Sequence, residues 1–229
     1  MTRPLLAALV LAVTLLAACA PTATRPPSLN QVRSAAERVS YYPVDTGLEW
    51  AYHEAEEDLA NRPLRVVGEG VALVTGGTAH KVRTYGRGLD VTRYYLRGDG
   101  LHLALEDRPG VRIEYLPPIT VYPPEGTLEV GARWGGSTIA YMSFLDAAPG
   151  QRSSRVNMEY FYTVIDERTV TTAAGDFRVY VIDLTATEFN TGRDAQALSQ
   201  EIWFAPYIGE VRTPTGYYLT AFSAPVAQP

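Results

Sequence analysis

The sequence has little of several residue types on which common enzyme mechanisms and metal sites depend. It contains one cysteine, Cys19, and one lysine, Lys81. A single cysteine cannot form a disulfide within the chain. The three histidines, His53, His80 and His102, are too widely spaced for a local zinc motif. We therefore expect no resident metal and no cofactor.

The usual catalytic sequence patterns are also missing. A serine hydrolase of the elbow type needs Gly-x-Ser-x-Gly, and the nearest match, residues 135–137, lacks the closing glycine. A Ser-x-x-Lys pair is excluded because Thr78 stands three residues before Lys81. A pair of carboxylates brought together by folding has no sequence signature. We therefore expect a protein that is not an enzyme, with a hydrolase as the least favoured alternative.

The charge balance argues against a nucleic-acid partner, and the apolar run near the N-terminus is too short for a membrane-spanning helix. The chain has 20 basic and 25 acidic residues, a net charge of −5, whereas nucleic-acid binding requires a basic face. The run from Leu5 to Leu16 is too short for a membrane-spanning helix, which needs about 20 apolar residues. It has the length of the apolar part of a signal peptide, so we expect residues 1–18 to be a signal peptide.

The end of this run resembles the lipobox of bacterial lipoproteins. The residues are Leu16, Ala17, Ala18 and Cys19. The resemblance implies cleavage before Cys19, attachment of lipid such as palmitate to its thiol, and a membrane anchor. Ala20 rather than Asp follows the cysteine, so the resemblance favours the outer membrane over the inner membrane.

The rest of the chain is expected to form one domain behind a tether. Residues 19–40 begin with Pro, Thr and Ala and read as the lipidated cysteine and a tether, with a short helix as an option after Ser28. Residues 41–222 are expected to form the domain, and residues 223–229 a flexible tail.

Turn signals and alternation predict an all-β domain. Segments 71–75 and 78–84 flank Gly76-Gly77, and segments 90–97 and 101–106 flank another glycine-rich turn. Both patterns are typical of antiparallel hairpins. Alternation places Leu101, Leu103 and Leu105 on one face and Glu106 on the other. The prolines of 116–124 indicate an edge or a crossover. We expect a curved antiparallel sheet or half-barrel.

A weak repeat suggests that the domain has two related halves. Gly47-x-x-Trp50 recurs as Gly131-x-x-Trp134. In each copy the glycine would permit a turn and the tryptophan would anchor the first strand in the core. We expect these four residues and Trp203 to be structural anchors. Chance recurrence of so short a pattern remains the alternative.

Together with the segments 172–177 and 203–211, these motifs resemble an uncharacterised family of bacterial envelope lipoproteins. The second segment reads Trp-Phe-Ala-Pro-Tyr-Ile-Gly-Glu-Val. The resemblance spans residues 41–222 and implies a curved antiparallel sheet, broadly similar to the half-barrels of periplasmic lipoprotein carriers. It implies no particular activity.

Paired aromatic residues are the candidate binding groups. Tyr94, Tyr95, Tyr160 and Tyr162 lie in predicted strands. Such rings could stack on sugars or line a cleft for an acyl chain, or could simply suit a half-buried sheet. We expect a non-catalytic module that binds or scaffolds an envelope protein, glycan or lipid. The alternative is a carrier that holds a lipid or another apolar ligand against a concave sheet.

Overall fold

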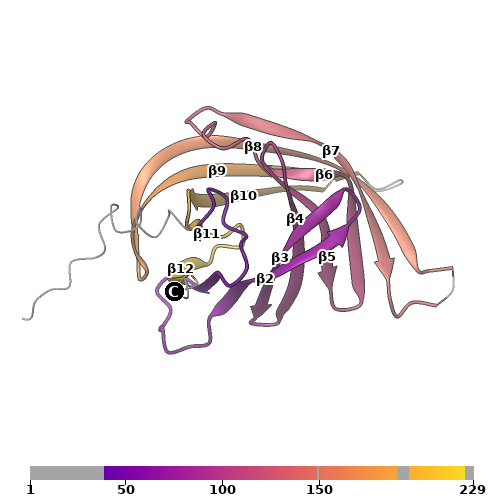
Figure 1. Cartoon of the computed structure of the whole chain (residues 1–229), viewed down its shortest axis with the longest axis horizontal. Helices are drawn as coiled ribbons and strands as arrows, with labels where there is room; N and C mark the ends of the chain where they lie inside the picture. The colour runs from indigo at the N-terminus through magenta and orange to yellow at the C-terminus, as the bar shows by residue number, and fades with distance from the viewer. Residues whose placement is uncertain (1–38, 149, 190–195, 225–229) are drawn as a thin grey trace, which may run out of the picture.

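The computed structural model describes residues 39–148, 150–189 and 196–224 (Figure 1). The predicted signal peptide, Cys19, the tether with its optional helix and residues 225–229 of the predicted tail lie outside these ranges. The predicted tail, residues 223–229, overlaps the last strand by one residue, Ser223.

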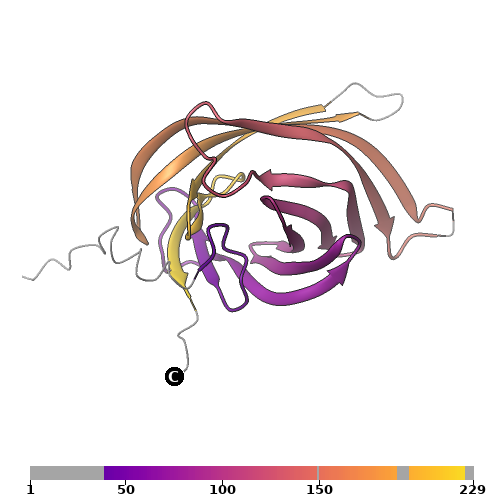
Figure 2. The ribbon, with the colours of Figure 1, turned by 45° about the horizontal axis from the view of Figure 1, so that its top comes forward.

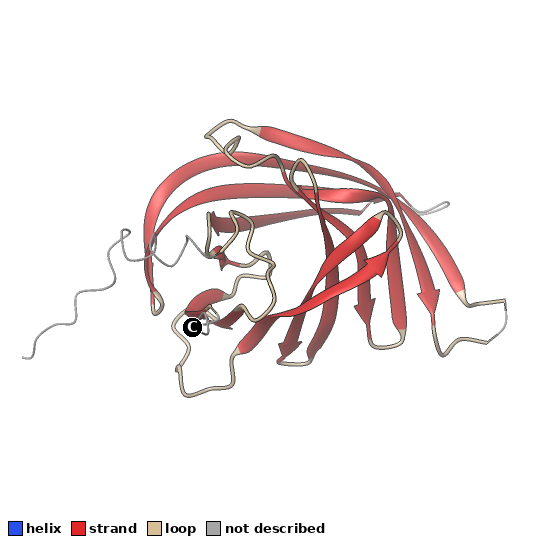
Figure 3. Ribbon diagram, viewed as in Figure 1, coloured by secondary structure: helices blue, strands red, loops and turns tan. Residues whose placement is uncertain are grey.

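Twelve strands form one closed antiparallel barrel, in the order β1-β12-β11-β10-β9-β8-β7-β6-β5-β4-β3-β2. Figure 3 shows strands and loops without a helix in the described part of the chain, and no helix there could span a membrane. The prediction of an all-β, antiparallel and strongly curved fold is confirmed. The strands are β1 (Glu49–His53), β2 (Leu64–Val74), β3 (Gly77–Gly86), β4 (Leu89–Arg97), β5 (Leu101–Arg108), β6 (Val111–Tyr122), β7 (Arg133–Phe144), β8 (Ser153–Thr172), β9 (Gly175–Phe189), β10 (Gln196–Ala205), β11 (Gly209–Arg212) and β12 (Tyr218–Ser223).

The two longest strands, β8 and β9, arch over the rest of the barrel (Figure 2). Successive side chains of a strand point to opposite faces, and β9 is buried on both. Ile182 belongs to the barrel interior with Tyr162 and Phe204. Its neighbour Val181 belongs to a second core, which β9 shares with Trp50 of β1 and other residues of β1, β11 and β12. The barrel therefore has two cores, one on each face of this arch.

Side-chain hydrogen bonds connect the barrel wall where β6 separates from β7. The two strands pair only as far as Leu116 and Ile139. Beyond that point Thr138 donates a hydrogen bond to the carbonyl of Pro117 (2.6 Å), and the backbone N–H of Thr120 donates to the hydroxyl of Tyr160 (3.0 Å). Prolines at this position cost the ladder little, because the separating strand does not need their N–H groups. The sequence prediction of an edge or crossover thus falls on a real break in pairing, although β6 continues through it.

One face assignment in β5 is wrong, and a β-bulge explains it. Tyr94 and Tyr95 are consecutive, but their partners are Leu105 and Leu103. Ala104 is therefore the extra residue, and it reverses the alternation after it. As a result Leu105 is only half-buried on the outer face, and Glu106, expected outside, points into the interior with 3% of its surface exposed.

The two Gly-x-x-Trp motifs have the same local backbone structure. Gly47 and Gly131 both have positive φ, 83° and 93°. The N–H of Gly47 donates to Gly68, whose own N–H donates back to the residue after Gly47. Gly131 makes the same reciprocal pair with Val164. This equivalence supports a duplication, which remains a prediction for the halves as a whole.

Replacing Gly131 with Ala should lower the free energy of unfolding by about 1–2 kcal/mol, the usual cost of a left-handed backbone for a residue with a Cβ. A Cβ at Gly131 would meet no atom within 4 Å, so the loss reports backbone strain alone. Gly131→Asn should lose less, because Asn tolerates this conformation. Urea unfolding measures both, and an Ala variant as stable as the parent would contradict the assigned backbone conformation.

Candidate functional site

The structure brings three of the four candidate tyrosines to the barrel interior. Tyr160 and Tyr162 are buried there, and Tyr95 packs against them half-buried. Tyr94 points the other way and donates a hydrogen bond to Asp107 (2.9 Å) on the outer face. The barrel interior therefore holds three of the candidate tyrosines, and Tyr94 lies outside it.

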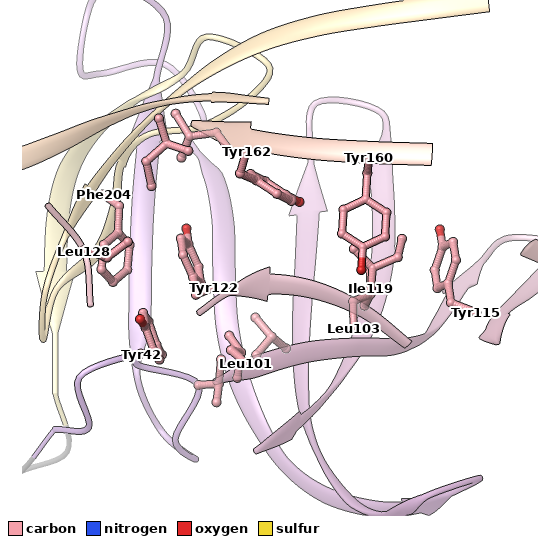
Figure 4. Close-up of a cluster of buried hydrophobic side chains, with 14 of the residues drawn as sticks. Tyr42, Leu101, Leu103, Tyr115, Ile119, Tyr122, Leu128, Tyr160, Tyr162 and Phe204 are labelled. Carbon is pink, nitrogen blue, oxygen red and sulfur yellow. The ribbon is translucent and has the colours of Figure 1, made fainter. Parts of the chain in front are cut away.

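One end of the interior is filled by aromatic rings. Tyr42 stacks on Tyr122 with ring centroids 5.0 Å apart, and Phe204 lies against both. The hydroxyl of Tyr42 donates to the carbonyl of Pro123 (2.6 Å). Figure 4 shows Tyr122 and Tyr162 reaching into the space between two layers of strands. This end is packed and leaves no room for a bulky ligand.

The three predicted tryptophan anchors occupy different surroundings. Trp50 is buried at the start of β1 in the second core, and its indole N–H donates to Ile208 (2.6 Å). Trp134 is half-buried at the start of β7 and stacks on Tyr162 (5.1 Å). Trp203 packs at the margin of the second core, where the guanidinium of Arg168 lies 4.7 Å from its ring.

Charged side chains also point into the interior. Arg93 lies opposite Val82 on one side and Glu106 on the other, and partners in a ladder share a face. The Nε of Arg93 donates to Glu106 (2.9 Å), whose other oxygen is bound by Arg108. The Arg93 side chain keeps 36% of its surface exposed although it faces inward. Solvent therefore reaches part of the Arg93 side chain within the interior.

Glu210 completes this group from the opposite side. It pairs with Phe204 between β10 and β11, so it faces the same interior. Burial raises the pKa of Glu210 to about 7, and the nearby charge of Arg93 and the hydroxyl of Tyr122 only partly oppose this rise. Loss of hydration lowers the pKa of Arg93, but Tyr95, Glu106 and Glu210 outweigh this effect and raise it overall. We call Arg93, Tyr95, Glu106, Tyr122 and Glu210 the lumen cluster.

Tyr122 has an unusual hydroxyl. The residue is 5% exposed, and its hydroxyl lies beside the carboxyl of Glu210, where it opposes the rise of that group's pKa, yet it meets hydrogen-bond geometry with no described residue. A buried polar atom without a partner is rare, because it loses its hydration without compensation. Its ring belongs to the packed end, and its hydroxyl lies near Glu210 and Tyr95, so this group is where the packed end meets the rest of the lumen cluster.

The wall formed by β7 to β10 is apolar and incompletely covered. Leu198 pairs with Ala186, which packs on the interior core, yet Leu198 is 51% exposed. Other half-buried apolar residues on this wall also face inward: Met142, Met158 and Leu184. The interior thus has a polar wall on β4 to β6 and β11 and an apolar wall on β7 to β10.

A hollow of about 380 Å³ lies where β6 separates from β7. Glu159 is the only charged residue among those that line it, so it offers less chemistry than the lumen cluster. Its lining residues are Leu116, Pro117, Ser137, Thr138, Ile139, Asn157, Met158, Glu159 and Phe189. Within the described ranges, no three His, Cys, Asp or Glu side chains gather as metal ligands.

Sequence reasoning did not single out Arg93, Glu106, Tyr122 or Glu210 as site residues. Arg93 and Glu106 lie in one predicted hairpin, and they pair in its observed register. Simple alternation does not predict this pair, because the bulge at Ala104 moves Glu106 to the opposite face of the strand. Nothing in the local sequence indicates that Tyr122 and Glu210 meet.

The raised pKa of Glu210 predicts a pH dependence of stability. Between its ordinary value of 4.5 and about 7, the folded chain keeps a proton that the unfolded chain has lost. Stability should therefore fall as pH rises through this window and become level above it. Urea unfolding between pH 4 and 9 tests this. Glu210→Gln should remove the slope and be the more stable protein above pH 7, and an unchanged slope in that variant would contradict the assignment.

Comparisons with solved structures identify the fold. A protein of Parabacteroides distasonis, described as a lipoprotein, matches with a TM-score of 0.51 at 12% identity, over 81% of this chain and 99% of that one. An exported protein of Bacteroides fragilis with a YmcC-like fold gives 0.49 at 13%, over 81% and 100%, and the hypothetical lipoprotein YmcC of Escherichia coli gives 0.39 at 12%, over 78% of each chain. The barrel shares its fold with the Parabacteroides protein. No protein-family model and no curated protein matches the sequence.

Proposed function

We propose that this chain is a non-catalytic binding module of the cell envelope, anchored through lipid on Cys19, and that its ligand occupies the barrel interior beside the lumen cluster. The outer membrane is the favoured anchor site, on the evidence of Ala20. The lipobox supports export, as does the description of the Parabacteroides protein as a lipoprotein.

The observation that carries the proposal is the hydroxyl of Tyr122. It is buried, it has no partner among the described residues, and it lies in the same interior as the partly exposed Arg93. A bound molecule with a hydrogen-bond acceptor would satisfy both groups. A packing role alone would be served equally well by Phe at position 122.

The cluster suits binding better than catalysis. Both oxygens of Glu106 are bound by arginines, so this carboxylate already serves as an ion-pair partner inside the barrel. Glu210 has a pKa suited to acid–base chemistry, but a glycosidase requires a second free carboxylate. The hydrolase alternative therefore becomes an outcome of the test.

Native mass spectrometry of the full chain purified from its own membranes tests the ligand proposal. We expect a non-covalent mass increment that disappears on denaturation, with the released molecule recovered unchanged after incubation with fresh protein. Conversion of that molecule to a product would identify an enzyme instead. Absence of any increment, together with no binding of molecules extracted from the envelope, would overturn the proposal.

Anchoring is tested separately with Cys19→Ala. The variant should incorporate no radioactive fatty acid and should not be cleaved before residue 19, because the acceptor thiol is gone. Metabolic labelling followed by electrophoresis measures both effects. Ala20→Ser is the matched control and should be labelled normally, whereas label retained by Cys19→Ala would show that the anchor lies elsewhere.

A further inference from the structure

We propose that the ligand is a single-chain amphiphile with a carboxylate headgroup, which Arg93 and Tyr122 bind while the apolar wall of β7 to β10 covers its alkyl chain. This inference rests on the proposed function, which places the ligand in the barrel interior, and it adds the chemical class of that ligand.

The lumen cluster offers hydrogen-bond donors rather than acceptors. Arg93 uses its Nε for Glu106, and its guanidinium, which also lies against Tyr95, keeps part of its surface exposed. The hydroxyl of Tyr122 is a second free donor. Glu106, the carboxylate next to Arg93, is already bound by Arg93 and Arg108, and Glu210 is the carboxyl beside Tyr122. Free donors beside an occupied acceptor select a ligand that accepts hydrogen bonds.

The charge of the cluster favours an anion. Arg93 and Arg108 face one carboxylate, Glu106, which leaves one positive charge in excess. Glu210 does not cancel this excess where it is protonated, and its pKa is raised to about 7. In its protonated form it becomes another donor. Arginine beside neutral donors is a suitable setting for a carboxylate, because its hydrogen bonds to an anion are charge-assisted.

The apolar wall accounts for the alkyl chain. Ile113 connects the two walls, because it pairs with Glu106 on one side and with Met142 on the other. Tyr162 pairs with Leu184. The charges of Arg93 and Glu210 shift the pKa of Tyr162, so this tyrosine lies near the lumen cluster. The exposed face of Leu198 extends this wall. A free sugar would cover these apolar side chains with hydroxyl groups. An alkyl chain would bury apolar surface against them, which is favourable.

Comparing the affinities of dodecanoate and dodecanol separates the contribution of the headgroup from that of the alkyl chain, because the two compounds have the same chain length. Residues 20–229 hold every strand and both cores, so this chain can be studied without detergent by isothermal titration calorimetry. We expect dodecanoate to bind about tenfold more tightly than dodecanol, as charge-assisted hydrogen bonds would give. Dodecyl phosphate identifies the preferred anion, and tighter binding of it than of dodecanoate would overturn the carboxylate assignment.

Two variants assign the effect to named groups. Arg93→Gln should abolish the preference for dodecanoate, and Tyr122→Phe should reduce it severalfold while leaving dodecanol binding unchanged. Tyr122→Phe removes only an unpartnered hydroxyl, so it should fold even if Arg93→Gln does not. Arg112→Gln is the control, because Arg112 pairs with Asp107 on the outer face.

The outcomes separate this inference from the proposed function. Equal binding of dodecanoate and dodecanol, unchanged in both variants, would overturn the headgroup assignment. Failure of both compounds to bind, while the membrane-purified chain carries a different ligand, would overturn the inference and leave the proposed function standing. An empty interior in both experiments would overturn the two together.

Discussion

Trp50→Ala should lower the free energy of unfolding by about 3–5 kcal/mol, the usual cost of truncating a large buried aromatic residue. Trp50 is 4% exposed, and its indole N–H is bonded to the carbonyl of Ile208, which the substitution would leave buried and unpaired. Such a loss is a large part of the 5–15 kcal/mol typical of a whole domain, so the variant should be degraded or misfold.

Trp134→Ala is the matched comparison and should cost about half as much. Its ring is only half-buried, and its hydrogen bond to Val121 is longer, at 3.3 Å. Urea unfolding of both variants, followed by tyrosine fluorescence, gives the two losses. Equal losses would show that the two tryptophans are equivalent anchors after all, and a stable Trp50→Ala variant would contradict the second core.

Glu106→Ala should destabilise the barrel by about 3 kcal/mol, toward the lower end of the range for a broken buried ion pair. The substitution leaves Arg93 facing inward without its bonded carboxylate, although solvent in the interior limits the cost. The neighbouring substitution Asp107→Ala breaks an ion pair with Arg112 on the outer face, and exposed pairs contribute only about 0–1 kcal/mol.

A double variant distinguishes charge from packing at this position. Glu106→Leu combined with Arg93→Met removes both charges and should recover most of the lost stability, because an apolar pair of similar volume avoids the buried charge. Thermal and urea unfolding measure the recovery. If Glu106→Ala costs no more than Asp107→Ala, Glu106 does not face the interior and the bulge in β5 is misassigned.

The hairpins were predictable because their signals are local. Gly76 and Gly77 have positive φ at the β2–β3 turn, where the sequence predicts a hairpin. Along β8 the alternating residues Met158, Tyr160, Tyr162 and Val164 all pack in the barrel interior. Turn chemistry and a period of two both act over a few residues, so a single sequence contains them.

The polar site was not predictable because it depends on events that leave no local signal. One extra residue, Ala104, reverses the face of Glu106, and alternation alone cannot locate a bulge. Tyr122 and Glu210 are 88 positions apart in the sequence, and only closure of the barrel brings them to one interior. The tyrosine pattern indicated β4 and β8, whereas Glu106, Tyr122 and Glu210 come from β5, β6 and β11.

A crystal structure of the full chain purified from its own membranes tests the central claim, that the barrel interior is the binding site. We expect electron density for a molecule beside Arg93, with an acceptor atom within hydrogen-bond distance of the Tyr122 hydroxyl. An interior in which Tyr122 instead donates directly to Glu210, with only water beside Arg93, would contradict the account.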